Sequence, residues 1–276
     1  MTRVNPHAAP SLSVGYLLRL IWTSRQLLAQ LTRREIHARY RGSVLGVLWA
    51  LLSPLLMLGV YTLIFSRVFQ AHWANAPTAV FASVLFVGLC VFNLFSDVLS
   101  RSPRLILDHA NYVKRVVFPL ELLTLVNCLV TLFQFSLNIL VLLAWQGFAQ
   151  GGIPLTAVFL PLVVMPVLLL AAGASWWISA LGVYLRDIAP IVTLLTMALM
   201  FLSPIFYSVD TLPRDLQYWF GYNPLALIID QARAVLIWGN YPKWRALAGL
   251  LLGSGLFAWL GFCWFQLTKK GFADVL

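Results

Sequence analysis

The sequence predicts an all-α integral membrane protein with six transmembrane helices, an N-terminal amphipathic interfacial helix, and re-entrant helices between spans five and six. Of its 276 residues, 61% are hydrophobic and only 10% are charged. This composition leaves too little polar surface to cover a soluble globule of that size. Several uncharged runs are also long enough to cross a hydrocarbon core of about 30 Å. We therefore expect residues 1–276 to form a single transmembrane domain.

Residues 12–41 are predicted to form a helix that lies in the membrane surface. At about 100° per residue, an apolar stripe falls opposite a cationic stripe. The two stripes are Leu17, Leu20, Ile21, Leu27, Leu28 and Leu31, and Arg19, Arg25, Arg33 and Arg34. The apolar stripe should face the acyl chains and the arginines the anionic headgroups. A solvated lead-in to the first span is the alternative interpretation.

Apolar runs predict the positions of the six spans, and the distribution of basic residues predicts their orientation. We expect the crossings at residues 44–66, 78–96, 116–145, 153–185, 188–209 and 246–268. Most of the 19 Lys and Arg residues then fall on one side of the membrane, which the positive-inside rule identifies as the cytoplasm. Both termini are predicted to be cytoplasmic. The basic residues expected outside are Arg67, Arg214, Arg233, Lys243 and Arg245.

The stretch 210–245 is predicted to hold two short helices that enter the outer leaflet and return. Asn223 is a good N-cap and Pro224 suits the first helical position of the second helix. Asp230 and Arg233 lie within the same apolar run, and a seventh crossing would place the C-terminal lysines outside. Such irregular backbone is tolerated at membrane depth only where protein or a wet cavity covers it.

The chain carries no motif for catalysis or nucleotide binding. The sequence lacks G-x-x-x-x-G-K-[ST], H-E-x-x-H and G-x-S-x-G, and its four histidines show no metal-ligand spacing. We therefore expect no enzyme activity, metal site or cofactor in this chain. The basic residues adjoin apolar spans, so membrane lipids rather than nucleic acid are the predicted partners.

Aromatic residues gather near the outer end of the fifth span and on the re-entrant helices. Aromatic faces stack on sugar rings while leaving the hydroxyl groups free, so these residues are candidates for the lining or gate of a sugar channel. An ordinary interfacial belt is the alternative. The candidates are Phe201, Tyr207, Tyr218, Trp219 and Tyr222.

The entrance to the first span carries the most specific pattern in the sequence. It reads Arg33-Arg34-Glu35-Ile36-x-x-Arg39-Tyr40-Arg41-Gly42-Ser43-x-Leu45-Gly46-x-Leu48-Trp49. This pattern resembles that of ABC-2-type permeases that export polysaccharides. Further stretches that look like family positions are Arg186-Asp187-Ile188, Ser203-Pro204-Ile205-Phe206-Tyr207, Tyr222-Asn223-Pro224-Leu225 and Gly271-Phe272-Ala273-Asp274.

The resemblance implies a homodimer bound to two separate ATPase subunits, which would hold the ATP and Mg. The complex would move a polyprenyl-pyrophosphate-linked polysaccharide outward across the bacterial inner membrane, with spans one and five lining the channel. Lipopolysaccharide O-antigen is the first candidate cargo, followed by capsular polysaccharide and teichoic acid. An ABC-2 drug or lipid exporter and a channel or flippase that uses no ATP are the other classes considered.

Two groups of basic residues are candidates for binding the substrate and the ATPase. A pyrophosphate needs cationic, multidentate donors at headgroup depth, and Arg34, Arg39 and Arg41 are the candidates for that role. Plain positive-inside anchoring is the alternative explanation for each of them. The resemblance also implies that the basic loop between spans two and three contacts the ATPase. The coupling candidates there are Arg101, Arg104, Lys114 and Arg115.

Overall fold

The computed structural model describes residues 12–42, 45–64, 78–114, 118–149, 152–185, 187–209 and 213–276. All regular secondary structure in these ranges is helical. Four helical stretches within them are long and apolar enough to cross a membrane, which makes the chain a multi-pass membrane protein. These stretches contain α4 (Thr78–Arg101), α6 (Glu121–Ala149), α7 (Leu160–Tyr184, preceded by η5, Leu155–Phe159) and α11 (Trp244–Thr268).

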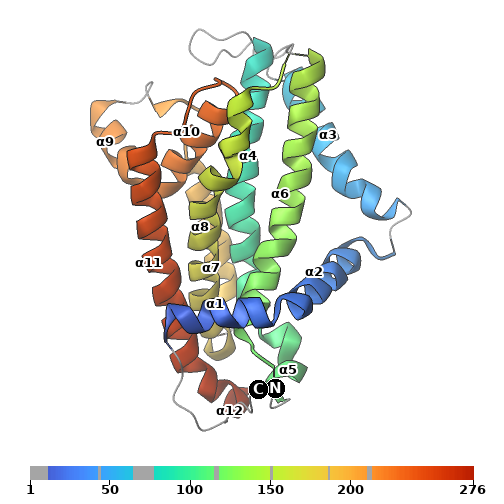
Figure 1. Cartoon of the computed structure of the whole chain (residues 1–276), viewed down its shortest axis with the longest axis vertical. Helices are drawn as coiled ribbons and strands as arrows, with labels where there is room; N and C mark the ends of the chain where they lie inside the picture. Colours follow the sequence, from blue (N-terminus) through green and yellow to red (C-terminus); the bar gives the residue numbers. More distant parts are fainter. Residues whose placement is uncertain are drawn as a thin grey trace.

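Two shorter apolar helices occupy the segments predicted as spans one and five. They are α3 (Trp49–Leu63, preceded by η1, Gly46–Leu48) and α8 (Ile188–Leu202), of 15 residues each. A helix of that length covers only about 22 Å, so helix length alone does not make them crossings. Figure 1 shows α3 tilted away from the long helices. Both helices expose most of their large apolar side chains.

The long helices pack most closely where α7 meets α11. A Cβ atom added to Gly261 would overlap the carbonyl of Gly173, and one added to Gly173 would lie 2.9 Å from the Cα of Ala258. Small residues at this crossing therefore let the two backbones approach directly. A second close contact lies near the C-terminal end of α7, where Gly182 meets the backbone of Pro103.

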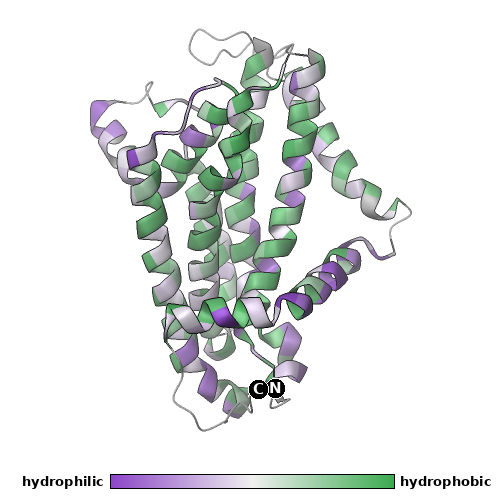
Figure 2. Ribbon diagram, in the orientation of Figure 1, coloured by the Kyte–Doolittle hydropathy of each residue, from purple (hydrophilic) through white to green (hydrophobic). Residues whose placement is uncertain are grey.

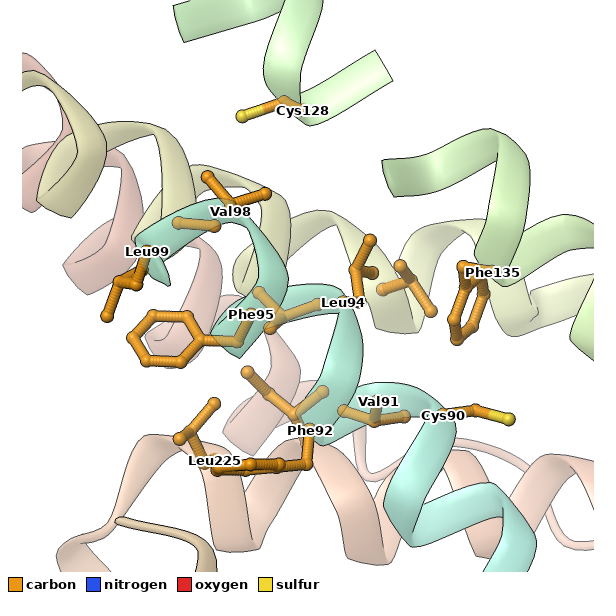
Figure 3. Close-up of a cluster of buried hydrophobic side chains, with 14 of the residues drawn as sticks. Cys90, Val91, Phe92, Leu94, Phe95, Val98, Leu99, Cys128, Phe135 and Leu225 are labelled. Atoms are coloured by element: carbon orange, nitrogen blue, oxygen red, sulfur yellow. The ribbon is translucent and has the colours of Figure 1, made fainter. Parts of the chain in front are cut away.

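Helix α4 supplies the centre of the apolar core. It packs against α6, α7 and α10 (Pro224–Leu236). Figure 3 shows Phe92 of α4 beside Leu225 of α10, and Phe135 of α6 on another side of α4, nearer Cys90. Cys90 and Cys128 are buried free cysteines in this core, where they act as packing residues.

The predicted interfacial segment 12–41 forms two helices, α1 (Val14–Thr23) and α2 (Arg25–Tyr40). Figure 1 shows α1 running across the long helices, and Figure 2 shows the hydrophilic character of α2. The prediction that their apolar stripe faces acyl chains is wrong for much of its length. Leu28 is buried among side chains of α6, with other stripe residues half-buried beside it. The α6 residues in this cluster are Leu122, Val126 and Val130.

The physical reason is that α6 presents its own apolar face at this depth, and packing the two faces together buries both. The apolar side chains of α1 that remain exposed are Val14, Leu18 and Trp22. They are four residues apart, so they form one outward stripe. This stripe, rather than the predicted one, is available to lipid.

A buried carboxylate links α1 to the ends of the long helices that lie near the C-terminus. Glu121 is 1% exposed and accepts hydrogen bonds from the Tyr16 hydroxyl (3.4 Å) and from the Nε2 atom of Gln266 (3.0 Å). The Lys269 ammonium lies 3.5 Å from the same carboxylate. Burial and the neighbouring Glu121 raise the pKa of Tyr16, which keeps its hydroxyl protonated as a donor. Helix α1 is therefore fixed to both α6 and α11.

At the opposite end, α9 (Arg214–Tyr222) is followed directly by α10. The predicted cap is confirmed, because the Asn223 side chain accepts hydrogen bonds from the backbone of Leu225 (3.0 Å) and Ala226 (3.4 Å). Pro224 occupies the first helical position, where its missing N–H costs nothing. Helix α10 ends at Leu236, shortly before Gly239, which has a φ of 65°.

Arg233, one of the basic residues expected outside, is instead buried within this end of the bundle at 4% exposure. Its guanidinium donates to the carbonyls of Val84 (3.1 Å), Pro204 (2.8 Å) and Ile205 (2.9 Å). Helix α8 ends just before Pro204, so carbonyls there lack helical partners. The buried arginine therefore supplies the donors that these carbonyls lack. Gly88 leaves the room that the guanidinium occupies.

The α7–α11 crossing predicts a strong dependence on side-chain size at Gly261. We expect Gly261→Ala to lower the free energy of unfolding by about 1–3 kcal/mol, because the added methyl group overpacks a contact between two backbones. Gly253→Ala on the same helix is the matched control, since a Cβ there meets nothing within 4 Å. Thermal unfolding of the two purified variants measures the difference. Equal stability of the two variants would contradict the close crossing.

Candidate functional site

Three arginines and a histidine converge on one cavity beside the start of α3. The cavity has a volume of about 680 Å³. Among the described residues no carboxylate lines it, so its walls are strongly cationic. Guanidinium groups bind phosphate oxygens bidentately and remain charged, which suits this cavity to a phosphate or pyrophosphate group. Its lining consists of Gln30, Arg33, Arg34, His37, Ala38, Tyr40, Arg41 and Gly46.

The cavity contains two of the three arginines predicted for headgroup binding. Arg34 lies within α2 and Arg41 is the residue that caps its C-terminal end, and both line the cavity. Arg33 and His37 also line the cavity, and the sequence reasoning missed them in this role. His37 lies three residues after Arg34 and four before Arg41, which is the signal that could have found it, whereas Arg33 is simply the neighbour of Arg34 in the sequence.

Arg39 lies apart from the basic cavity. Five positions at about 100° each turn it about 140° from Arg34, toward the opposite side of α2. It is half-buried, and burial together with nearby Arg101 lowers its pKa to about 10, although Asp97 acts in the opposite direction. Its Nε and Nη2 atoms are buried without a hydrogen-bond partner. Arg39 therefore does not line the cavity that Arg34 and Arg41 share, and its role in headgroup binding stays a prediction.

A side-chain amide on α6 fixes the wall of the cavity. The Tyr40 hydroxyl donates to Oε1 of Gln134 (2.7 Å). The Nε2 atom of Gln134 donates to the carbonyl of Ala50 (3.1 Å) and to Oδ1 of Asn138 (3.1 Å). These bonds connect α2, α6 and the start of α3. The sequence analysis did not single out Gln134, which is one of several amides in α6 together with Asn127, Asn138 and Gln146.

Two of the predicted coupling residues, Arg101 and Arg104, lie at a compact turn that follows the C-terminal end of α4. Arg101 ends α4, Arg104 ends the following η3 (Ser102–Arg104), and both side chains are exposed. The turn rests on α7, because the Ser102 hydroxyl donates to the Ser175 hydroxyl (2.7 Å) and the backbone of Pro103 meets Gly182. The turn follows α4 in the chain and is held against α7 by these contacts.

The remainder of this loop is only partly described. It continues through η4 (Leu107–His109) and α5 (Ala110–Lys114). The backbone of Lys114 belongs to α5, but its side chain and the whole of Arg115 lie outside the described residues. The structure therefore brings Arg101 and Arg104 to one exposed turn and leaves the other two coupling candidates unplaced.

Contacts among the predicted channel aromatics fall into two groups. In the first, the Tyr207 hydroxyl donates to the carbonyl of Phe201 (2.8 Å), and the Tyr207 ring meets Phe220 edge to face, with centroids 5.8 Å apart. In the second, the rings of Tyr218 and Tyr222 lie 5.1 Å apart, and both residues are exposed. The side chain of Trp219 lies outside the described part of the chain.

Comparison with known proteins gives the family. Residues 26–237 match the ABC-2 type transporter family. The chain is 29% identical to the O-antigen export system permease protein RfbA of Myxococcus xanthus over 94% of this chain and 98% of that protein. It is 27% identical to the Klebsiella pneumoniae protein of the same name over 96% of this chain and 97% of that protein.

A third relative carries a different name. The polysialic acid transport protein KpsM of Escherichia coli is 28% identical over 81% of this chain and 89% of that protein. The matched family region begins in α2 and ends after α10, so it includes the basic cavity, the turn Ser102–Arg104 and the outer aromatic residues. The chain belongs to the ABC-2 type transporter family.

Proposed function

We propose that this chain is the permease subunit of an ATP-driven exporter of lipid-linked polysaccharide, with O-antigen as the first candidate cargo. The observation that carries the proposal is the similarity over almost the whole chain to relatives named as O-antigen export permeases. The relative named for polysialic acid transport makes capsular polysaccharide the second candidate. ATP and Mg belong, in this proposal, to two separate ATPase subunits bound to a permease dimer in the bacterial inner membrane.

We further propose six crossings, with α3 and α8 as the first and fifth, and with α9 and α10 re-entrant from the outer side. The apolar residues exposed on α3 and α8 would then face lipid, the second copy of the chain and the channel between the copies. The burial of α10 against α4 and α7 supports this arrangement, because re-entrant backbone at membrane depth needs cover from protein.

The topology predicts that the two ends of the bundle lie on opposite sides of the membrane. Cysteines introduced as Asp215→Cys on α9 and Asp274→Cys on α12 (Phe272–Val275) replace exposed side chains. In intact cells, a membrane-impermeant maleimide should label the first variant and leave the second unlabelled until the membrane is opened. Both cysteines need a background without reactive native thiols. Labelling of Asp274→Cys from outside would refute the six-span arrangement.

The basic cavity is the proposed site for the pyrophosphate of the cargo lipid. Its arginines lie close to the exposed apolar helix α3, so a headgroup bound there would lie at the entrance to the proposed channel. The positive-inside alternative needs only charge, whereas recognition of a pyrophosphate needs the forked geometry of the guanidinium group.

Arginine-to-lysine substitutions separate these explanations. We expect Arg34→Lys and Arg41→Lys to lower export per assembled complex by about tenfold, because each removes charge-assisted bidentate hydrogen bonds. Arg39→Lys is the matched control on the other side of α2 and should export normally. Export of the glycan is measured in cells that contain only the variant permease. Normal export by both cavity variants would leave anchoring as the explanation, and no export by the wild-type complex would refute the function itself.

The exposed turn around Arg101 and Arg104 is the proposed contact with the ATPase. Because this turn is held rigidly on α7, movement of a docked subunit would be passed to α7 and α4 together. Lys114 and Arg115 extend the same basic segment in sequence.

Charge reversal at the turn tests this contact. Arg104→Glu should leave membrane insertion intact but reduce the amount of ATPase that co-purifies with the permease, because a docked acidic partner surface would be repelled. Arg214→Glu is the control, as it reverses an exposed arginine on α9 at the opposite end of the molecule. If Arg104→Glu retained full ATPase binding and normal export, the docking role would be wrong.

The outer aromatic residues are proposed to border the sugar path. Many shallow stacking contacts hold a moving polymer without trapping it, whereas a few strong hydrogen bonds would hold it back. Tyr218 and Tyr222 are the most exposed of the described candidates.

Removing both rings distinguishes a sugar path from a membrane belt. The double variant Tyr218→Ala/Tyr222→Ala should lower export per assembled complex, or make the resting membrane leak ions, while the dimer and its ATPase remain assembled. Tyr241→Ala removes a comparably exposed ring and should do neither. A double variant that loses thermal stability yet exports normally per complex would show that these rings form only a belt.

A further inference from the structure

A second cavity lies on the other side of Arg33 and His37 from the basic cavity. It is a groove of about 460 Å³ between α2 and α6. Apart from Arg33, His37 and Thr32, its walls are apolar. The full lining is Ala29, Thr32, Arg33, Ile36, His37, Leu129 and Phe133. We call this cavity the α2–α6 groove.

The helical repeat of α2 explains why the two cavities are neighbours. Ala29, Arg33 and His37 are four residues apart and form one edge of α2, facing Leu129 and Phe133 of α6 across the groove. The basic cavity shares Arg33 and His37 with the groove. A cationic site and an apolar groove therefore adjoin along two common side chains.

Such a pair of sites matches a ligand with a strongly anionic head and one apolar chain. The three arginines of the cavity need several negative charges to balance them, as a pyrophosphate provides. The groove is bounded by two helices and offers one apolar channel next to the cavity, which suits one chain better than the paired chains of a phospholipid.

We propose that the α2–α6 groove holds the apolar chain of the cargo lipid while its pyrophosphate occupies the basic cavity. This inference rests on the proposed function and adds the direction of approach: the lipid reaches the cavity along the flank of α2 and α6 rather than between α3 and α8. Arg33 and His37 then mark the boundary between the headgroup and the chain.

Two alanines of α2 allow the chain and the head to be tested separately. Ala29 lines only the groove and Ala38 only the basic cavity, and both are exposed. Replacing either by Trp fills the neighbouring space without entering the packed core. The probes are farnesyl pyrophosphate and inorganic pyrophosphate, with binding to the full-length permease in nanodiscs measured by calorimetry.

The wild-type permease should bind farnesyl pyrophosphate at least tenfold more tightly than inorganic pyrophosphate, since each buried methylene contributes about fourfold in affinity. Ala29→Trp should abolish that advantage and leave the affinity for inorganic pyrophosphate unchanged. Ala38→Trp should weaken the binding of both probes. Dioleoyl phosphatidic acid in excess should not displace farnesyl pyrophosphate.

The other outcomes each overturn a defined part of the proposal. Equal affinity of the wild type for the two probes, or an unchanged advantage in Ala29→Trp, would show that the groove holds no chain while leaving the headgroup site standing. Failure of both probes to bind would refute the headgroup site and the groove together. Displacement by phosphatidic acid would make the groove a general phospholipid site, and loss of the dimer in Ala29→Trp would make it a contact between subunits.

Discussion

The close crossing of α7 and α11 is the constraint on which the rest of the bundle depends. Its backbones meet at Gly173 and Gly261 without intervening side chains. Helix α7 also packs against the turn Ser102–Arg104 through Gly182 and Ser175. The indole of its Trp176 donates to the backbone carbonyl of Glu121 (3.3 Å). A change in the spacing of α7 and α11 would therefore shift both the proposed ATPase contact and the position of α1.

Unsatisfied polar groups explain the irregular features at both ends of the molecule. Inside a bilayer a backbone carbonyl must find a donor within the protein. The buried guanidinium of Arg233 fills this need where α8 ends, and Nδ2 of Asn223 donates to the carbonyl of Leu202 at the same end. At the end nearer the C-terminus, the Glu121 carboxylate accepts hydrogen bonds from α1 and α11. Charged residues in this protein thus serve its architecture as well as its proposed transport.

Helix α2 separates environments of different chemistry. One side packs on α6 through Leu28, a neighbouring edge borders the α2–α6 groove, and the next edge borders the basic cavity. The Tyr40–Gln134 hydrogen bond holds the last turn of α2 against α6. In the proposed function, these edges of α2 would contact different parts of an amphipathic lipid, because the groove is mostly apolar and the cavity is cationic.

The sequence by itself determined the all-helical class, the position of a helix in each predicted span segment and the cap at Asn223, since apolar runs and capping residues act locally. It also determined the family, through the pattern around Arg33 to Trp49. Only the tertiary structure decided that the stripe containing Leu28 faces α6, that Arg233 is buried, and that Arg34 and Arg41 share a cavity without Arg39. A hydrophobic period cannot distinguish a lipid-facing stripe from a protein-facing one, because both surroundings are apolar. Nor can a charged residue's sequence neighbours reveal which distant carbonyls it will meet.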